Sequence, residues 1–198
     1  MKPLVLASGN PGKLREFGQM LAQFDFELLP QSHFAVPEVE EPHVTFVENA
    51  LVKARHAARL TGLPALADDS GLCVSALGGA PGVRSARYAG EPKSDERNNR
   101  QLIADLQPFA DRRAHYVAVL VFLRHADDPQ PLIAEGEWHG EIVATPQGAG
   151  GFGYDPYFWL PQYGCTAAQL PSAEKNRQSH RGKALAHLVE RIRLSLNV

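Results

Sequence analysis

The sequence predicts an α/β fold that forms a single domain over all 198 residues. A short apolar run at residues 4–7 leads through a glycine-containing turn into a segment with helical periodicity, as at the start of an α/β unit. A second apolar run, residues 63–67, follows another helical segment. Residues 116–123 are apolar and rich in β-branched and aromatic side chains, which is typical of a central strand.

The first half of the chain predicts two helices separated by a loop. The first helix begins near residue 13, with apolar positions at Leu14, Phe17, Leu21 and Phe24. Residues 37–42 are acidic and bounded by prolines, which predicts an extended loop. Thr45 and Glu48 have capping-box spacing for a helix over 46–60 that ends at Gly62. Its polar stripe consists of Thr45, Asn49, Lys53 and His56.

The second half predicts a charged helix over 96–106 and further strands. A turn at residues 127–130 leads to a strand at Leu132 and Ile133, and Ile142 and Val143 supply another strand. A glycine-rich loop follows at residues 148–156. The chain ends in a helix over 179–196, and we expect its apolar face to belong to the core. That face consists of Leu185, Leu188, Val189, Ile192 and Leu196.

Composition excludes several classes of protein. With 20 basic and 22 acidic residues, the chain has no overall positive field that would draw it to a nucleic acid polymer. Cys73 and Cys165 lie far apart, so we expect neither a disulfide framework nor a zinc knuckle, and interpret both as packing or surface residues. The first apolar run is too short for a signal peptide, and no stretch approaches the roughly 18 apolar residues of a membrane span. We therefore expect a cytoplasmic protein without membrane association.

The turn after the first strand is a candidate phosphate site. Free backbone N–H groups and the helix dipole both favour an anion at such a turn, and a lysine adds a point charge. The segment is not a P-loop, because Leu14 stands where Ser or Thr would follow the lysine. An ordinary strand-to-helix turn is the alternative. The candidate residues are Ser8, Gly9, Asn10, Pro11, Gly12 and Lys13.

Asp68 and Asp69 directly follow the second apolar run, so we place them at the carboxyl end of a strand, where α/β sheets bind ligands. Two carboxylates there suit a divalent cation such as Mg²⁺, although successive strand residues point to opposite faces. The alternative is an aspartate turn that caps a helix. The acidic loop offers further candidate metal ligands in Glu38, Glu40 and Glu41, and the alternative is a solvated surface loop. Lys53, on the polar stripe of the helix over 46–60, could likewise be a solvated surface residue.

Two segments near the end of the chain are suited to a nucleotide base. The first segment consists of Phe152, Gly153, Tyr154 and Asp155. Its aromatic rings can stack on a base, and its carboxylate can accept hydrogen bonds from one. Residues 174–181 bring the cations Lys175, Arg177 and Arg181, with His180, to the start of the final helix. Cations there oppose the helix dipole, which favours a compensating ligand. The alternatives are aromatics that cap the core and a solvated basic turn.

Six motifs follow one another along the whole chain, from the first predicted strand to the last predicted helix. They are Ser8-Gly9-Asn10-x-x-Lys13, Phe46-x-Glu48-Asn49-Ala50-x-x-Lys53-Ala54, Ala67-Asp68-Asp69-Ser70-Gly71-Leu72, Gly78-Gly79-x-Pro81-Gly82-x-x-Ser85, Gly151-Phe152-Gly153-Tyr154-Asp155-Pro156 and Glu174-Lys175-Asn176-x-x-Ser179-His180-Arg181-Gly182. In this order they resemble the inosine triphosphate pyrophosphatase family, which includes the bacterial dITP/XTP pyrophosphatases. Ser8 stands where threonine is common in that family, which keeps the hydroxyl group.

The resemblance implies an elongated mixed β-sheet flanked by helices, in two lobes with a central nucleotide cleft, and a homodimer. It also implies hydrolysis of the deaminated purine nucleoside triphosphates ITP, dITP and XTP to the monophosphate and pyrophosphate, with Mg²⁺. The cellular role would be to keep these nucleotides out of DNA and RNA. Which of the three is preferred, and how guanine is rejected, the sequence does not indicate.

The resemblance also implies roles for residues. Asp69 would bind the metal and accept a proton from the attacking water, with Asp68 in support and Glu41 as the second metal ligand. Asn10, Lys13 and Lys53 would contact phosphates, with the backbone of residues 8–13 and Ser70 also binding substrate. Phe152 would stack on the base in a pocket lined by Gly153, Tyr154, Asp155 and Lys175, while His180 and Arg181 read its edge.

Two other functions stay open from the residues alone. A pyrophosphatase for modified nucleotides, such as a methylated pyrimidine, would share the metal and phosphate residues but not the base-binding segments. A receiver-like signalling domain also combines an acidic pair with a lysine in an α/β fold. In that class, however, the acidic pair follows the first strand, whereas Asp68 and Asp69 follow the second apolar run.

Overall fold

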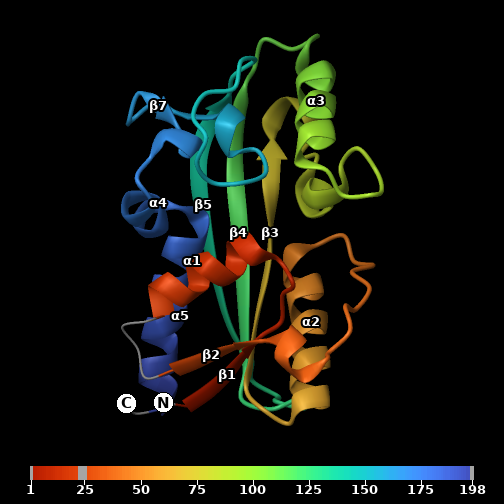
Figure 1. The fold of residues 1–198 in the computed structure, drawn as a ribbon, viewed down its shortest axis with the longest axis vertical. Helices are drawn as coiled ribbons and strands as arrows, with labels where there is room; N and C mark the ends of the chain where they lie inside the picture. Colours follow the sequence, from red (N-terminus) through yellow and green to blue (C-terminus); the bar gives the residue numbers. More distant parts are fainter. Residues whose placement is uncertain (1, 22–25, 197–198) are drawn as a thin grey trace. The chain divides into compact units, whose positions relative to one another are not determined.

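The computed structural model describes residues 2–21 and 26–196, and within them the strands form one mixed sheet in the order β2-β1-β3-β4-β5-β6-β7 (Figure 1). The chain divides into two compact units. Unit 1 comprises residues 1–69, 118–136 and 182–198, and unit 2 comprises residues 70–117 and 137–181. The strands β3 (Ala65–Val74), β4 (Arg113–Leu123) and β5 (Leu132–Ile142) each contribute residues to both units.

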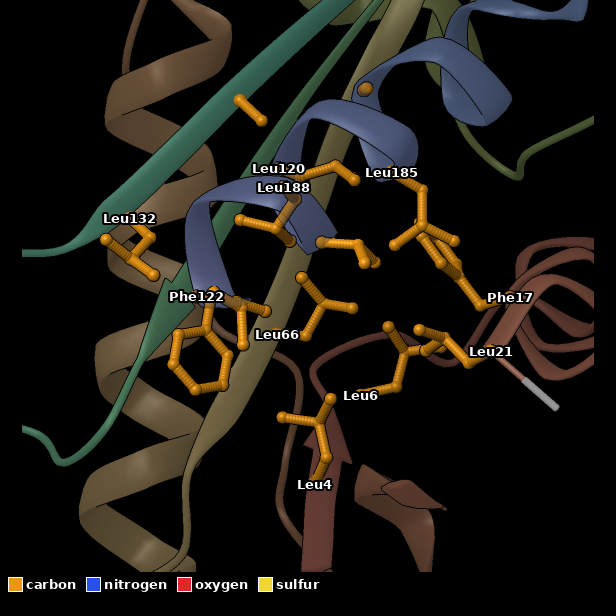
Figure 2. Close-up of a cluster of buried hydrophobic side chains, with 14 of the residues drawn as sticks. Leu4, Leu6, Phe17, Leu21, Leu66, Leu120, Phe122, Leu132, Leu185 and Leu188 are labelled. Carbon is orange, nitrogen blue, oxygen red and sulfur yellow. The ribbon is translucent and has the colours of Figure 1, made fainter. Parts of the chain in front are cut away.

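Unit 1 begins with the predicted strand, turn and helix. Strand β1 (Lys2–Leu6) pairs in parallel with both β2 (Phe26–Pro30) and β3. Its core combines β1, β3, β4 and β5 with α1 (Pro11–Leu21) and α5 (His180–Leu196), as Figure 2 shows. The predicted apolar face of α5 is confirmed as core at Leu185, Leu188, Val189 and Ile192. Phe24 and the side chain of Leu196, which the helical patterns included, lie outside the described residues.

Helix α2 (Phe46–Thr61) has the ends that the sequence predicts. The side chain of Thr45 accepts a hydrogen bond from the backbone N–H of Glu48, which caps the first turn. Gly62 ends the helix in the left-handed conformation, with φ +68°, and its N–H donates to the carbonyl of Ala58. The buried face of α2 is made of small side chains, which allows the helix to pack closely against β1. They are Asn49, Ala50, Ala54, Ala57 and Ala58.

Unit 2 has a hydrophobic core of its own. Leu102 and Leu106 of α3 (Asp95–Leu106) pack with Leu72, Tyr116 and Trp138 of the sheet. Strands β6 (Phe158–Leu160) and β7 (Cys165–Thr166) extend the sheet from β5 with antiparallel pairing. The remaining elements are α4 (Ser172–Gln178), η2 (Ser75–Leu77), η3 (Gly82–Arg87), η4 (Asp155–Tyr157) and η5 (Ala167–Gln169), while η1 (Gln31–Phe34) belongs to unit 1.

Two predictions about strands are wrong. Strand β3 does not end at Asp68 but continues to Val74, because both aspartates are paired with lysines and the strand can bury them. Gly71, inside the strand, leaves room for the carbonyl of Gly82, with which a Cβ at this position would collide. The two strands expected around residues 132 and 142 are one strand, β5, in which buried residues alternate with exposed ones.

Several elements were not predicted at all, namely β2, β6, β7 and α4. Both cysteines are free, as their separation in the sequence indicates, and both are half-buried. Among the described residues, no helix is both long and apolar enough to cross a membrane.

Candidate active site

The turn after β1 is held in place by its own side chains. The Oδ1 atom of Asn10 accepts hydrogen bonds from the N–H groups of Gly12, at 2.8 Å, and of Lys13, at 3.3 Å. Asn10 therefore acts as the N-cap of α1, and Pro11 takes the first helical position, where its missing N–H costs nothing. The hydroxyl of Ser8 accepts from the N–H of Asn10. The predicted strand–turn–helix is confirmed, and binding of phosphate to it stays a prediction.

Lys13 extends from this turn to β3. Its Nζ atom lies 3.2 Å from Oδ2 of Asp68 and donates to the backbone carbonyl of the same residue. The carboxylate of Asp68 is fully buried, so it needs this partner to remain ionised. Asp68 thus fixes the position of a lysine at the start of α1.

Lys53, from the polar stripe of α2, lies at the centre of a second set of contacts. Its Nζ atom is 2.7 Å from Oδ1 of Asp69, 3.1 Å from Oε2 of Glu41 and 3.0 Å from the backbone oxygen of Asp68. We call the group formed by Lys13, Glu41, Lys53, Asp68 and Asp69 the carboxylate–lysine cluster. Every member of it belongs to unit 1.

The acidic loop contributes Glu41 to this cluster. The Oε1 atom of Glu38 lies beside Gly9, where an added Cβ would meet it at 3.3 Å. Glu41 contacts Lys53 directly, and it is also the residue that the resemblance favours. Its function as a metal ligand stays a prediction.

The polar stripe of α2 also anchors the acidic loop. Buried Asn49 accepts from the N–H of His43 and donates to the carbonyl of His43, both at 3.1 Å. Nearer the start of the loop, Nε2 of His56 lies 3.0 Å from the carbonyl oxygen of Pro37. Helical spacing in the sequence places Asn49 and His56 on one face with Lys53, but it does not indicate which backbone groups they contact.

The electrostatics of the cluster follow from burial and from the lysines. Burial raises the pKa of Asp69 to about 6, against the opposing effect of Lys53. Burial also disfavours the charge on Glu41, but Lys53 together with Asp69 and Lys13 keeps the pKa of Glu41 below its usual value. Burial likewise disfavours the charge on Lys53, yet Asp69 and Glu41 raise its pKa. The lysine thus stays charged between two carboxylates.

The carboxylate–lysine cluster contains the oxygen ligands that a hard divalent cation prefers. Asp69 Oδ2 is buried and has no hydrogen-bond partner among the described residues. The described residues include no group of three or more His, Cys, Asp or Glu side chains suited to a metal. A carboxylate pair is nevertheless sufficient for Mg²⁺, which commonly takes one or two protein carboxylates and completes its coordination with phosphate and water.

In unit 2 a buried ion pair organises the glycine-rich loop. Asp155 Oδ2 accepts from Lys175 Nζ, at 2.8 Å, and from the N–H of Phe152, at 2.9 Å. A Cβ at Gly151 would collide with the same carboxylate, so this position requires glycine. Asn99 and Asp95 of α3 hold Gly153 through its carbonyl and its N–H. These two α3 residues were missed, because nothing in their local sequence indicates a loop 54 or more positions away.

The ring of Phe152 is in contact with two cations. Lys175 Nζ lies 5.0 Å from the ring centroid and Arg181 Cζ lies 5.3 Å from it. Arg181 also donates from Nη2 to the hydroxyl of Ser70, at 2.9 Å. We call Phe152, Asp155, Lys175 and Arg181 the aromatic–cation cluster.

His180 and Tyr154 are placed in the interior of unit 2. The imidazole of His180 stacks on Tyr116, with ring centroids 4.7 Å apart and an interplanar angle of 9°. The hydroxyl of Tyr154 donates to the backbone carbonyl of Ser85, and its ring is part of the core. Tyr154 therefore fits the alternative of an aromatic that packs in the core, and direct contact of either residue with a substrate stays a prediction.

The open mixed sheet and the carboxylate–lysine cluster define an α/β protein with buried carboxylates and lysines, side chains that are chemically suited to a divalent cation and to phosphate groups. Within that class, the chain belongs to the Ham1 family, whose sequence model matches residues 4–191. The match thus covers nearly all of the chain, including both clusters.

Relatives with known names support the same assignment. The chain is 64% identical to the dITP/XTP pyrophosphatase of Ralstonia nicotianae over the full length of both, and 64% identical to that of Chromobacterium violaceum over 96% of each. Among solved structures it resembles a HAM1 protein from Coxiella burnetii, with a TM-score of 0.89 and 47% identity over 100% of this chain and 99% of the other. The Ham1 protein of Staphylococcus aureus gives a TM-score of 0.87 and 39% identity, over 98% and 100% of the two chains.

Proposed function

We propose that this protein hydrolyses deaminated purine nucleoside triphosphates, namely dITP, ITP and XTP, to the nucleoside monophosphate and pyrophosphate. The names of its relatives support this function. The observation that carries this function in this chain is that two consecutive residues of β3 make contacts in the two different clusters. Asp69 pairs with Lys53 in the carboxylate–lysine cluster, and Ser70 accepts from Arg181 in the aromatic–cation cluster. The first cluster supplies groups suited to the phosphates of a nucleotide, and the second supplies groups suited to its base.

Phosphate binding would fall to groups of unit 1. The lysines Lys13 and Lys53 supply positive charge, and the exposed residues 9–11 lie at the N-terminus of α1. Asp69 and Glu41 would hold Mg²⁺, which when bound neutralises the triphosphate and orients its phosphorus atoms. Asp68 supports this arrangement indirectly, since its buried carboxylate holds Lys13.

The base would be recognised by the aromatic–cation cluster. The face of Phe152 offers a surface on which any base can stack. Arg181 carries donors only, so it can pair with the 6-carbonyl of hypoxanthine or xanthine but not with the 6-amino group of adenine. Adenine would leave the guanidinium unpaired, at a cost of roughly 1–3 kcal/mol.

The hydrolytic step needs a group that removes a proton from the attacking water. Asp69 is suited to that task, because burial brings its pKa to about 6, close to the pH at which a general base works best. In the free protein, Lys53 holds this carboxylate in place through a 2.7 Å contact. Positioning and charge neutralisation would supply the remaining catalysis, as is usual for phosphoryl transfer.

The direct test is release of pyrophosphate, with Mg²⁺, from a panel of dITP, ITP, XTP, dATP, dGTP and 5-methyl-dCTP. Release mainly from the inosine and xanthine nucleotides is expected, and Asp69→Asn should abolish it while nucleotide binding persists. Preference for the methylated pyrimidine would favour the alternative pyrophosphatase. Phosphorylation of an aspartate without pyrophosphate release would favour a signalling domain.

We further propose that the protein acts in the cytoplasm as a homodimer and folds as a single domain. Light scattering of the purified chain should give twice the mass of the 21.6 kDa monomer. Thermal unfolding followed at Trp138 in unit 2 and by circular dichroism should give one coincident transition.

A further inference from the structure

The ammonium group of Lys53 lies between the two carboxylates that are proposed to hold a metal ion. We propose that Lys53 is an internal cation that neutralises Glu41 and Asp69 in the free protein and moves to the phosphates when a divalent cation replaces it. This inference rests on the proposed function and adds a consequence to it: metal and triphosphate would bind cooperatively, with Lys53 as the link.

Geometry supports this role for Lys53. Its Nζ atom takes one oxygen from each carboxylate, Oδ1 of Asp69 at 2.7 Å and Oε2 of Glu41 at 3.1 Å. Because one ammonium group contacts both, the two carboxyl groups lie close to each other. Two carboxylates this close repel unless a cation lies between them, and in the free protein that cation is Lys53.

The charges in the cluster favour an exchange of cations. Three carboxylates, Glu41, Asp68 and Asp69, share the two ammonium groups of Lys13 and Lys53. Lys13 is held by Asp68, whereas Lys53 bridges the pair formed by Glu41 and Asp69. A divalent ion in its place would neutralise both carboxylates, which one ammonium group cannot do, and would release that ammonium group for an anionic ligand.

Asp69 also has capacity for a further ligand while Lys53 is bound. Its Oδ2 atom is buried and has no hydrogen-bond partner among the described residues. A lone ammonium group therefore leaves part of the coordinating capacity of this carboxylate unused. The long side chain of Lys53 can withdraw by rotation about its own bonds, which leaves the backbone of α2 in place.

Linkage makes the proposal measurable. If metal binding frees Lys53 for phosphate, then phosphate binding must favour metal binding by the same factor. Removing the charge at Lys53 should therefore have two opposite effects. Metal should bind more tightly to the protein alone, and a triphosphate should enhance metal binding less.

The experiment measures Mn²⁺ binding by electron paramagnetic resonance, with and without an α,β-methylene analogue of dITP that cannot be cleaved. In the wild type, the analogue should tighten Mn²⁺ binding at least about fivefold. Lys53→Met should bind Mn²⁺ at least about fivefold more tightly than the wild type without the analogue, and the analogue should enhance Mn²⁺ binding less than it does in the wild type. Lys53→Arg keeps the charge and should retain weak Mn²⁺ binding in the free protein.

Lys13→Met is the matched control, since it removes a second lysine of the same cluster that is held by Asp68. Its effect on Mn²⁺ binding without the analogue should be clearly smaller than that of Lys53→Met. Glu41→Gln should weaken Mn²⁺ binding, which shows that the ion binds at this pair. Circular dichroism and thermal unfolding establish that each variant is folded.

Unchanged or weaker Mn²⁺ binding in Lys53→Met would overturn the inference. Equally tightened Mn²⁺ binding in Lys13→Met would also overturn it, as would unchanged Mn²⁺ binding in Glu41→Gln. These results are separate from the proposed function, which depends on pyrophosphate release by the wild type. Release of pyrophosphate without coupling between Mn²⁺ and the analogue would leave the function standing and remove the role of Lys53.

Discussion

The side chain of Asn49 binds the backbone of His43 on both sides, accepting from its N–H and donating to its carbonyl. The two residues are six positions apart, one in α2 and the other at the end of the acidic loop. Because Asn49 is buried, neither backbone group is easily satisfied by water if the amide is removed. Glu41 lies two residues before this anchor, so Asn49 acts as a positioning residue for the carboxylate–lysine cluster.

Asn49→Ala should weaken Mn²⁺ binding about fivefold or more, because the loop that carries Glu41 loses its anchor. It should also lower the free energy of unfolding by roughly 1–3 kcal/mol. Asn98→Ala is the matched control, since buried Asn98 likewise binds a backbone N–H, of Ala89, and a carbonyl, of Ala86. A similar loss of stability without weaker Mn²⁺ binding is expected there, and equal effects on Mn²⁺ would contradict a positioning role.

Ser70→Ala should reduce the preference for dITP over dATP. Without the hydroxyl, Arg181 loses the acceptor that lies 2.9 Å from its Nη2 atom. The guanidinium group can then turn toward other base edges. The ratio of kcat/KM values for the two substrates should fall by up to about tenfold, the effect of a hydrogen bond to a charged group. Ser75→Ala, at an exposed position, should leave the ratio unchanged. An unaltered ratio in Ser70→Ala would move base discrimination to another residue.

Gly151→Ala should impair substrate binding through Asp155. A Cβ at Gly151 collides with the Asp155 carboxylate, which must then leave Lys175 and the N–H of Phe152. Gly164→Ala is the control for backbone strain, because Gly164 also has positive φ, +61°, but its Cβ would meet open space. Both variants should lose about 1–2 kcal/mol of stability from that strain. A raised KM for dITP is expected in Gly151→Ala alone, and an equal change in both would indicate that only strain matters.

Binding of Mn²⁺ in the absence of nucleotide should weaken as the pH falls through about 6. Burial raises the pKa of Asp69 to about 6, so protons compete with the cation for this carboxylate below that pH. Glu41, whose pKa is kept low by Lys53, stays ionised over the same range. Titration of Mn²⁺ affinity between pH 5 and 8 measures the effect, and in Asp69→Asn the dependence near pH 6 should vanish. An affinity that stays constant across this range in the wild type would refute it.

Local patterns were sufficient wherever a structure depends on nearby residues. The ends of α2 follow from Thr45 and Gly62, whose capping geometry involves neighbours within four positions. The turn before α1 and the apolar face of α5 were predicted for the same reason. Patterns failed at β3, where a run of Asp, Asp, Ser and Gly is typical of a turn but lies inside a strand. Burial of those aspartates depends on Lys13, 55 positions away, and on Lys53, 16 positions away.

The sequence by itself therefore determined the fold class, the kinds of side chain available for phosphate, metal and base, and their order along the chain. Tertiary structure decided which of those side chains contact one another. It brought Glu41 to Lys53 and Asp69, left Glu38 beside Gly9 and used the hydroxyl of Tyr154 inside the core. The physical reason is that a buried charge or polar group takes its role from the partner that neutralises it, and such partners are chosen by folding.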